Sequence, residues 1–231
     1  MPPSSRLQIE TAAEEIAAIL EEEIALGHLS PRERLVEEEL AERFQVKRHV
    51  IRQALVALDA MGIVVRPPNR GAAVKDFSIS EVDQLYAVRI LVEGYAAELM
   101  PFPVPGTVIS QLRAIHKRHC QAADRGDLRS VFRENLKFHD TLYAACGNIP
   151  LAEVIQQLAF KTHAIRSYSI GNPDILVLVR EEHARMISLL QSGNRSEFVA
   201  LVKAHLLPAK NAYLQLSRHK DGAFARPSIK K

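Results

Sequence analysis

The sequence of 231 residues contains no tryptophan, only two cysteines and only ten glycines. Two cysteines are too few for a disulfide framework, and Cys120 and Cys146 lack the paired spacing of a zinc-binding cluster. We interpret both as buried or incidental thiols in a reduced cytosolic compartment. The scarcity of glycine, beside abundant alanine, leucine, glutamate and arginine, favours helices over a β-sandwich or barrel.

Long apolar runs are also missing from the sequence. No run approaches the roughly 18 residues that a membrane span needs, and the start MPPSSRLQIE lacks the apolar core of a secretory signal. We therefore exclude a membrane span and expect a cytoplasmic protein. The composition, 47% apolar and 25% charged, is that of a folded globular chain. At roughly 100 to 200 residues per domain, we expect two domains.

Apolar periodicity predicts three helices and a hairpin within residues 1–76. Apolar residues recur at helical spacing over residues 9–24. Residues 36–44 and 47–61 form two further short helices joined by a tight turn, which is the size of a helix-turn-helix unit. Residues 63–74 then predict a small β-hairpin, with two β-branched or small apolar runs around a PPNRG turn. This order of elements is typical of a winged helix, with the hairpin as the wing.

The remainder of the chain predicts helices throughout. Breaks rich in glycine and proline divide residues 77–217 into about six helices, and short loops favour an all-α antiparallel bundle. Residues 218–231 lack periodicity, so we expect a mobile basic tail. The predicted fold class is therefore mainly α: a winged helix-turn-helix domain over residues 1–76, followed by a helical domain over residues 77–217.

Charge is distributed unevenly along the first domain. The net charge of the whole chain is only +3. Residues 43–75, however, contain seven lysines and arginines and a single acidic residue, Asp59. Such a block can be a solvated face or an electrostatic footprint for phosphates, and charge alone does not decide between them.

The second short helix resembles a DNA-recognition helix in its pattern. Arg48 and Arg52 are four residues apart and share one face, opposite the apolar residues that hold the helix to its scaffold. Donors at its N-terminus can meet phosphates and guanine edges in the major groove, and Arg70 at the hairpin tip can enter the minor groove. Each arginine alone is more often a solubilising residue, but together they predict binding to double-stranded DNA. The candidate contacts are Lys47, Arg48, His49, Arg52, Arg70 and Gly71.

Three of the nine histidines, His139, His183 and His205, fall on different predicted helices. The interior of a helical bundle is where side chains from facing helices can converge on a metal ion. A lone histidine there is more often a hydrogen-bonded core residue, so the spacing leaves both interpretations open. Arg89 has two interpretations as well. It could grip an effector carboxylate with two parallel hydrogen bonds, or form a surface pair with Glu93 four residues on.

The segment RLVEEELAERFQVKRHVIRQALVALDAMGIVVRPPNRGAAV resembles the N-terminal domain of GntR-family bacterial transcription regulators. The helical remainder resembles the ligand-binding FCD domain of their FadR subfamily, through R-x-x-x-E at Arg89, then N-L-K-F-H, E-E-H and A-H-L. The resemblance covers nearly the whole chain. It implies that Arg48 and Arg52 contact DNA from the helix, and Arg70 with Gly71 from the wing.

The same resemblance implies a metal site with an effector beside it. The implied ligands are Asn135, His139, His183 and His205, with Asn135 in place of the family's usual aspartate. Because all four are neutral, an anionic effector or water would complete the shell. The ligand types favour zinc, with nickel or another divalent ion as alternatives. Arg89 is the candidate to hold a small carboxylic acid; Arg166 could also line the cavity but is assigned no role.

These inferences together predict a homodimeric, effector-responsive regulator that reads a pseudo-palindromic operator. Release of DNA on effector binding, meaning repression, is the commoner behaviour in the family. Two alternatives stay open, a metal-dependent hydrolase that uses the three-histidine centre and a pure metal sensor. The hydrolase lacks an obvious general base, because Glu182 is expected to point away from the centre, and we predict that the protein is not an enzyme.

Overall fold

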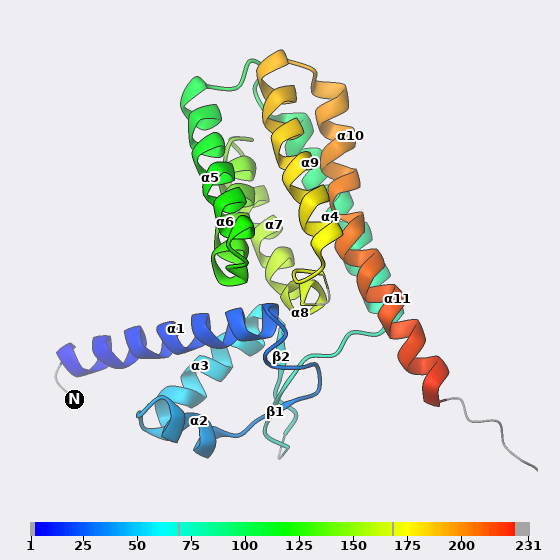
Figure 1. Cartoon of the computed structure of the whole chain (residues 1–231). Helices are drawn as coiled ribbons and strands as arrows, with labels where there is room; N and C mark the ends of the chain where they lie inside the picture. Colours follow the sequence, from blue (N-terminus) through cyan, green and yellow to red (C-terminus); the bar gives the residue numbers. More distant parts are fainter. Residues whose placement is uncertain (1–2, 69, 168, 225–231) are drawn as a thin grey trace, which may run out of the picture.

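The computed structural model describes residues 3–68, 70–167 and 169–224 (Figure 1). Within these ranges the chain is largely helical, with one small sheet, and no helix is long and apolar enough to cross a membrane. The elements are α1 (Pro3–Ala25), β1 (Arg34–Leu35), α2 (Glu37–Arg43), α3 (Arg48–Met61), β2 (Val64–Val65), β3 (Ala72–Val74), α4 (Ile79–Leu99), α5 (Gly106–Asp124), α6 (Leu128–Ala144), α7 (Ile149–Lys161), α8 (His163–Arg166), α9 (Pro173–Ser192), α10 (Arg195–His205) and α11 (Leu207–Phe224).

The first part of the chain forms a winged helix. Helices α2 and α3 make the helix-turn-helix, and α3 ends at Gly62, whose left-handed φ of 77° suits glycine. Strands β2 and β3 are the antiparallel wing, with Val64 opposite Val74. Strand β1, which was not predicted, also pairs with β3, so β3 is the central strand of three. Two residues are too few for an alternating pattern to show in the sequence.

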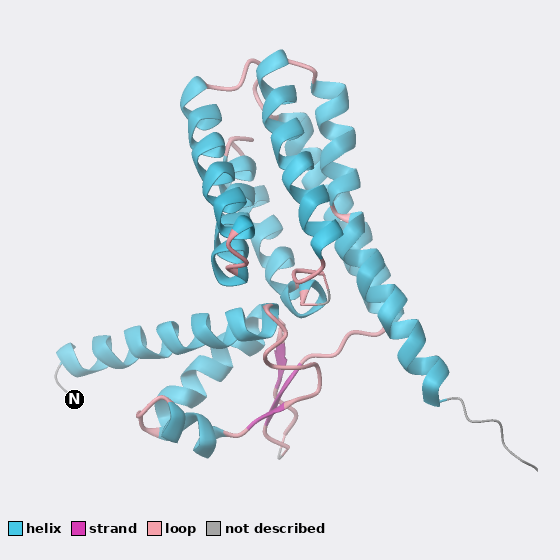
Figure 2. Cartoon of the chain, viewed as in Figure 1, coloured by secondary structure: helices cyan, strands magenta, loops and turns pink. Residues whose placement is uncertain are grey.

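The second part is an all-α bundle (Figure 2). It contains eight described helices rather than about six, because two expected helices are each divided. The helix expected after residue 150 is divided at Thr162, whose hydroxyl donates to the carbonyl of Ala159 at 2.7 Å. The last one is divided at Leu206, because Pro208 has no N–H to continue the helical bonding.

Helix α11 runs to Phe224 and so includes residues 218–224 of the segment expected to be a tail. Residues 225–231 lie outside the described residues. In Figure 1, α11 continues past the lower end of the bundle, beside the winged helix.

Two apolar cores stabilise the fold. One lies within the bundle around Phe138 and Phe198. The other fills the winged helix around Leu20 and Leu58 but also takes in residues of the bundle: Val82 and Tyr86 of α4, Ala164 and Ile165 of α8, Leu206, and Tyr213 of α11. The two domains therefore share one core.

Helix α1 carries several of the polar contacts between the domains and lies between the bundle and α2–α3 (Figure 1). The carboxylate of Glu21 lies 2.8 Å from Nδ1 of His163 in α8. The buried carboxylate of Glu22 accepts a hydrogen bond from Arg133 of α6 at 2.7 Å and also pairs with Arg129. A shift of α8 or α6 would therefore act directly on α1 through these contacts.

Candidate DNA interface and metal centre

Helix α3 presents an exposed basic face, as its pattern predicts. Lys47, Arg48, His49 and Arg52 are all exposed, whereas the opposite face is buried through Val50, Ile51, Ala54, Leu55 and Leu58. Arg70 and Gly71 are exposed in the turn of the wing. Gly71 has a φ of +74° with open space where a Cβ would stand, so backbone conformation rather than space favours glycine there.

Both arginines of this face pair with carboxylates of α2. Nη2 of Arg52 lies 3.0 Å from Oε2 of Glu37, with a second bond of 3.3 Å from Nε to Oε1, and Arg48 pairs with Glu38. The hydrogen bond from Arg52 lowers the pKa of Glu37. The arginine side chains are 57% and 60% exposed, and such surface pairs contribute little net stability. Phosphates can therefore replace these carboxylates at low cost.

Three histidines from three helices meet inside the bundle. His139 of α6, His183 of α9 and His205 of α10 have ligand nitrogens that all lie within 4.8 Å of one another. Nε2 of His205 is 3.3 Å from Nε2 of His139. The structure thus brings together the three predicted histidines, and their binding of a metal stays a prediction.

The chemistry of this centre fits a divalent ion. Both ring nitrogens of His183 and Nδ1 of His139 are buried without a hydrogen-bond partner among the described residues, which is costly unless something binds there. Two nitrogens at about 2.0–2.1 Å from a tetrahedral zinc ion lie roughly 3.3 Å apart, which matches the separation of His139 and His205. Burial lowers the pKa of His139 and of His183 well below the usual range, so both rings are neutral and keep a lone pair.

Glu182 orients one ligand of the centre. Nδ1–H of His205 donates to the Glu182 carboxylate at 2.6 Å, which leaves Nε2 of His205 free to face His139. A carboxylate behind a metal-binding imidazole is the usual means of fixing the ring. The expectation that Glu182 has no part in this site is wrong, because α9 and α10 pack side by side and bring together residues 23 positions apart.

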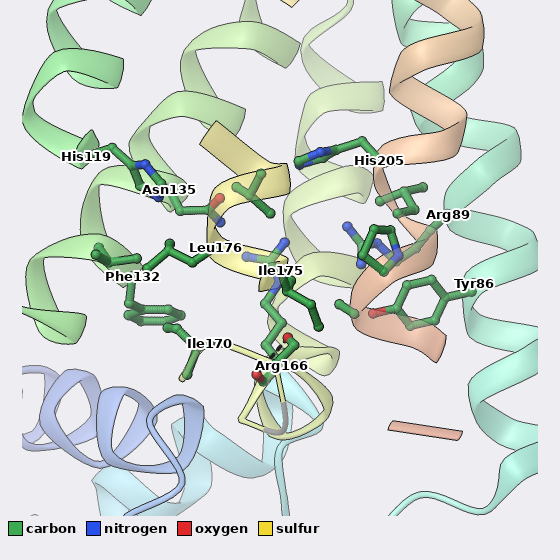
Figure 3. A pocket seen from close by; sticks show the side chains of 16 residues that line it. Tyr86, Arg89, His119, Phe132, Asn135, Arg166, Ile170, Ile175, Leu176 and His205 are labelled. Carbon is green, nitrogen blue, oxygen red and sulfur yellow. Dashed lines mark hydrogen bonds between the residues drawn. The ribbon is translucent and has the colours of Figure 1, made fainter. Parts of the chain in front are cut away.

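A pocket adjoins the histidine centre (Figure 3). His119 and Asn135 lie at one side of it, and His205 and Arg89 lie at the other. Its walls are mainly apolar, with contributions from Val131, Phe132, Ile170, Ile175, Leu176, Val179 and Leu206. The side chain of Asn135 points into the pocket, and its role as a ligand stays a prediction.

Two arginines reach this pocket, the buried Arg89 and the half-buried Arg166, and they differ in their partners. Arg89 donates from Nε to Glu93 at 2.8 Å and from Nη1 to Thr162 at 3.3 Å, and Glu93 also accepts from Tyr143 at 2.5 Å. The pair of Arg89 with Glu93 is therefore formed, but in the interior rather than on the surface.

Arg166, by contrast, extends from α8 into the pocket, and its buried Nη1 has no hydrogen-bond partner among the described residues (Figure 3). Burial, followed by the charge of Arg89, lowers the pKa of Arg166. A guanidinium with an unpaired buried nitrogen between apolar walls attracts an anion. Arg166 lines the cavity, as the sequence analysis allowed, but its unpaired nitrogen could not be predicted, because one arginine near a helix break forms no pattern.

A winged helix with an exposed basic face, joined to a bundle that encloses a mainly apolar pocket with a few polar side chains, is the architecture of a DNA-binding regulator with a ligand-binding domain. Two family models specify the class. The model of bacterial regulatory proteins of the gntR family matches residues 12–74, and the FCD domain model matches residues 84–207. The chain belongs to the GntR family of bacterial transcription regulators and carries an FCD effector-binding domain.

Relatives of this chain are regulators of the same kind. The HTH-type transcriptional regulator LutR of Bacillus subtilis is 26% identical over 201 residues, which cover 78% of this chain and 91% of LutR. The HTH-type transcriptional repressor RspR of Escherichia coli is 22% identical over 212 residues, covering 92% and 93%. The solved structure of E. coli McbR/YncC matches with a TM-score of 0.77 at 19% identity, over 89% of this chain and 98% of McbR, and shows the shared fold.

Proposed function

We propose that the protein is a homodimeric repressor whose affinity for its operator is controlled by a small organic acid, bound beside a divalent metal ion in the FCD domain. The observation that carries the proposal is the position of Arg166. Its Nη1 has no hydrogen-bond partner among the described residues, and its side chain lines the same pocket as His205 of the histidine centre. One carboxylate can therefore be held by Arg166 and also complete the shell of an ion on the histidines.

His139, His183 and His205 would hold the ion, with Asn135 as the further candidate ligand, and zinc suits imidazole ligands best. When bound, the ion supplies a Lewis-acidic position for a carboxylate oxygen. Arg89 holds its place through Glu93 and contributes positive charge to the pocket wall. The hydrolase alternative is disfavoured, because the carboxylate nearest the centre, Glu182, is engaged by His205.

DNA binding is assigned to the exposed face of α3 and to the wing. Lys47, Arg48, His49 and Arg52 would enter the major groove, with Arg70 and Gly71 at the minor groove. Arg48 and Arg52 would exchange Glu38 and Glu37 for phosphates or base edges. Repression is supported by the relative RspR, which is named as a repressor.

Helix α8 offers a route from the pocket to the DNA-binding domain. Its Arg166 reaches the pocket, its His163 contacts Glu21 of α1, and its Ile165 belongs to the shared core. An anion that draws Arg166 towards the histidines would move α8 and, through it, α1 and α3. Such a shift changes the distance between the two winged helices of a dimer, and therefore the fit to two half-sites.

The dimer itself is supported by an apolar strip on α4. Val88, Leu91 and Tyr95 are spaced to share a face, and Leu91 is 70% exposed. A large apolar side chain so exposed is typical of a surface that another chain covers. Leu91→Glu should therefore yield monomers in sedimentation experiments, and an unchanged oligomeric state would exclude this face.

The experiment that tests the proposal measures the thermal unfolding midpoint with a panel of small carboxylic acids, each with and without a chelator. A stabilising acid should lose its effect when metal is removed. Arg166→Met should abolish the stabilisation by that acid, with Arg185→Met as the matched control, because Arg185 of helix α9 is exposed and pairs with Glu197 outside the pocket. An acid that stabilises equally after chelation would show that the metal is dispensable, whereas metal that alone changes operator affinity would indicate a metal sensor.

A further inference from the structure

A second cluster of metal-ligand side chains lies on α5, outside the centre described above. His116, His119 and Cys120 occupy positions i, i+3 and i+4, which share one face of the helix. Their ligand atoms all lie within 4.8 Å of one another, and the sulfur of Cys120 is 3.5 Å from Nε2 of His116. The cluster shares no residue with the His139, His183 and His205 centre.

The burial of His119 indicates that this cluster binds something. His119 is only 1% exposed, and its Nδ1 has no hydrogen-bond partner among the described residues, which is costly for a buried polar atom. The guanidinium of Arg180, from α9, pairs with Asp124 near the end of α5 at 3.0 Å and so brings a positive charge to this part of the helix. A neighbouring cation compensates the negative charge that a sulfur ligand must carry.

We propose that His116, His119 and Cys120 form a second metal site, for a thiophilic cation such as Zn²⁺ or Cd²⁺. Two imidazoles and one thiolate are a ligand set that selects such ions over Mg²⁺ or Ca²⁺. Three protein ligands leave one position open for water or for a ligand in the pocket, which His119 also lines. The ring of His119 lies 5.5 Å from that of His183, so the two centres are neighbours and can affect each other's affinity.

Cobalt provides a direct probe, because a thiolate bound to Co²⁺ gives a charge-transfer band that imidazoles alone do not. The full-length protein, freed of metal with a chelator and titrated with Co²⁺, should bind about two equivalents and develop this band. Cys120→Ser should lose the band and about half of the bound cobalt. The matched control is Cys146→Ser. Because Cys146 is buried in the bundle core, its substitution should change neither the charge-transfer band nor the amount of bound cobalt. A band that persists in Cys120→Ser, or that never appears in the wild-type protein, would overturn the proposal.

The His205→Ala variant separates this site from the centre in the proposed function. It removes a ligand of the first centre only, so it should keep the thiolate band while it binds less cobalt. If its cobalt content equals that of the wild-type protein and the band is kept, His139, His183 and His205 do not form a metal site, whereas the site at Cys120 is supported. If the band is lost, the cluster does not bind metal on its own and the proposal fails.

Alkylation of Cys120 tests the same site without a substitution in the cluster. In His205→Ala protein, Zn²⁺ or Cd²⁺ should slow the reaction of Cys120 with iodoacetamide, because a metal-bound sulfur is no longer a free nucleophile. Labelling of each cysteine is followed by peptide mass spectrometry, with Cys146 as the internal reference. Equal rates for Cys120 with and without metal would contradict the site.

Discussion

Arginines in the two domains are arranged in opposite ways. On the winged helix, Arg48 and Arg52 are exposed to solvent and yet paired with carboxylates of α2. In the bundle, Arg166 is half-buried, and its buried Nη1 has no hydrogen-bond partner among the described residues. Burial normally requires pairing and exposure does not. The comparison indicates that the carboxylates on the DNA face of the winged helix can be replaced by phosphates. The unpaired nitrogen of Arg166 in the bundle, by contrast, can be paired by a bound ligand.

The largest expected effect separates Arg89 from Arg166. Arg89→Met would leave the buried carboxylate of Glu93 without its cation, and breaking such a pair costs about 3–5 kcal/mol of unfolding free energy. Arg166→Met removes a charge for which no ion pair is formed among the described residues, and it should leave stability unchanged or increase it. Denaturant unfolding of both variants measures the difference. Equal destabilisation by the two substitutions would mean that Arg166 has a structural partner after all.

Substitutions at the histidine centre come next. His183→Ala should lower the metal content of the purified protein, as measured by elemental analysis. Glu182→Gln keeps the shape of the side chain but weakens its hold on His205, and should reduce metal affinity by about 10- to 100-fold. A full complement of metal in His183→Ala would remove that residue from the site.

Operator binding tests the role of the exposed arginines of α3. Arg52→Ala should weaken affinity by about 1–3 kcal/mol if Arg52 contacts a base edge, with fold and effector binding unchanged. Arg43→Ala is the matched control, because Arg43 is also exposed and paired, with Glu23, but belongs to α2. Fluorescence anisotropy with an operator fragment, at one fixed salt concentration, gives both affinities. Unaltered affinity in Arg52→Ala would refute its assigned role.

The smallest expected effect comes from the partner of Arg52. Glu37→Gln removes the carboxylate that Arg52 must leave on binding DNA, so operator affinity should rise, by less than about fivefold for an exposed pair. The same anisotropy titration measures it. A fall in affinity would mean that Glu37 positions Arg52 for DNA instead of competing with DNA for it.

How far the sequence predicts each site depends on how local the site is. The DNA face of α3 follows from the spacing of Arg48, Arg52 and the apolar residues between them, all within one helix. His139, His183 and His205 were found because a family pattern supplemented their spacing. Glu182 was missed because its partner lies on another helix. Arg166 was considered as a cavity residue but given no role, because its unpaired buried nitrogen arises only from packing. His116, His119 and Cys120 do form a local motif. It was missed because Cys120 was considered only together with Cys146, for a disulfide or a paired zinc-binding spacing, and not with the histidines beside it.

The shared core has a consequence for cooperativity. Because Ile165 and Leu206 of the bundle pack with Leu20 and Leu58 of the winged helix, neither domain can unfold without exposing apolar surface of the other. The two should therefore melt in a single transition. A ligand held only in the bundle would then also slow amide hydrogen exchange in α1 and α3, although it contacts neither helix.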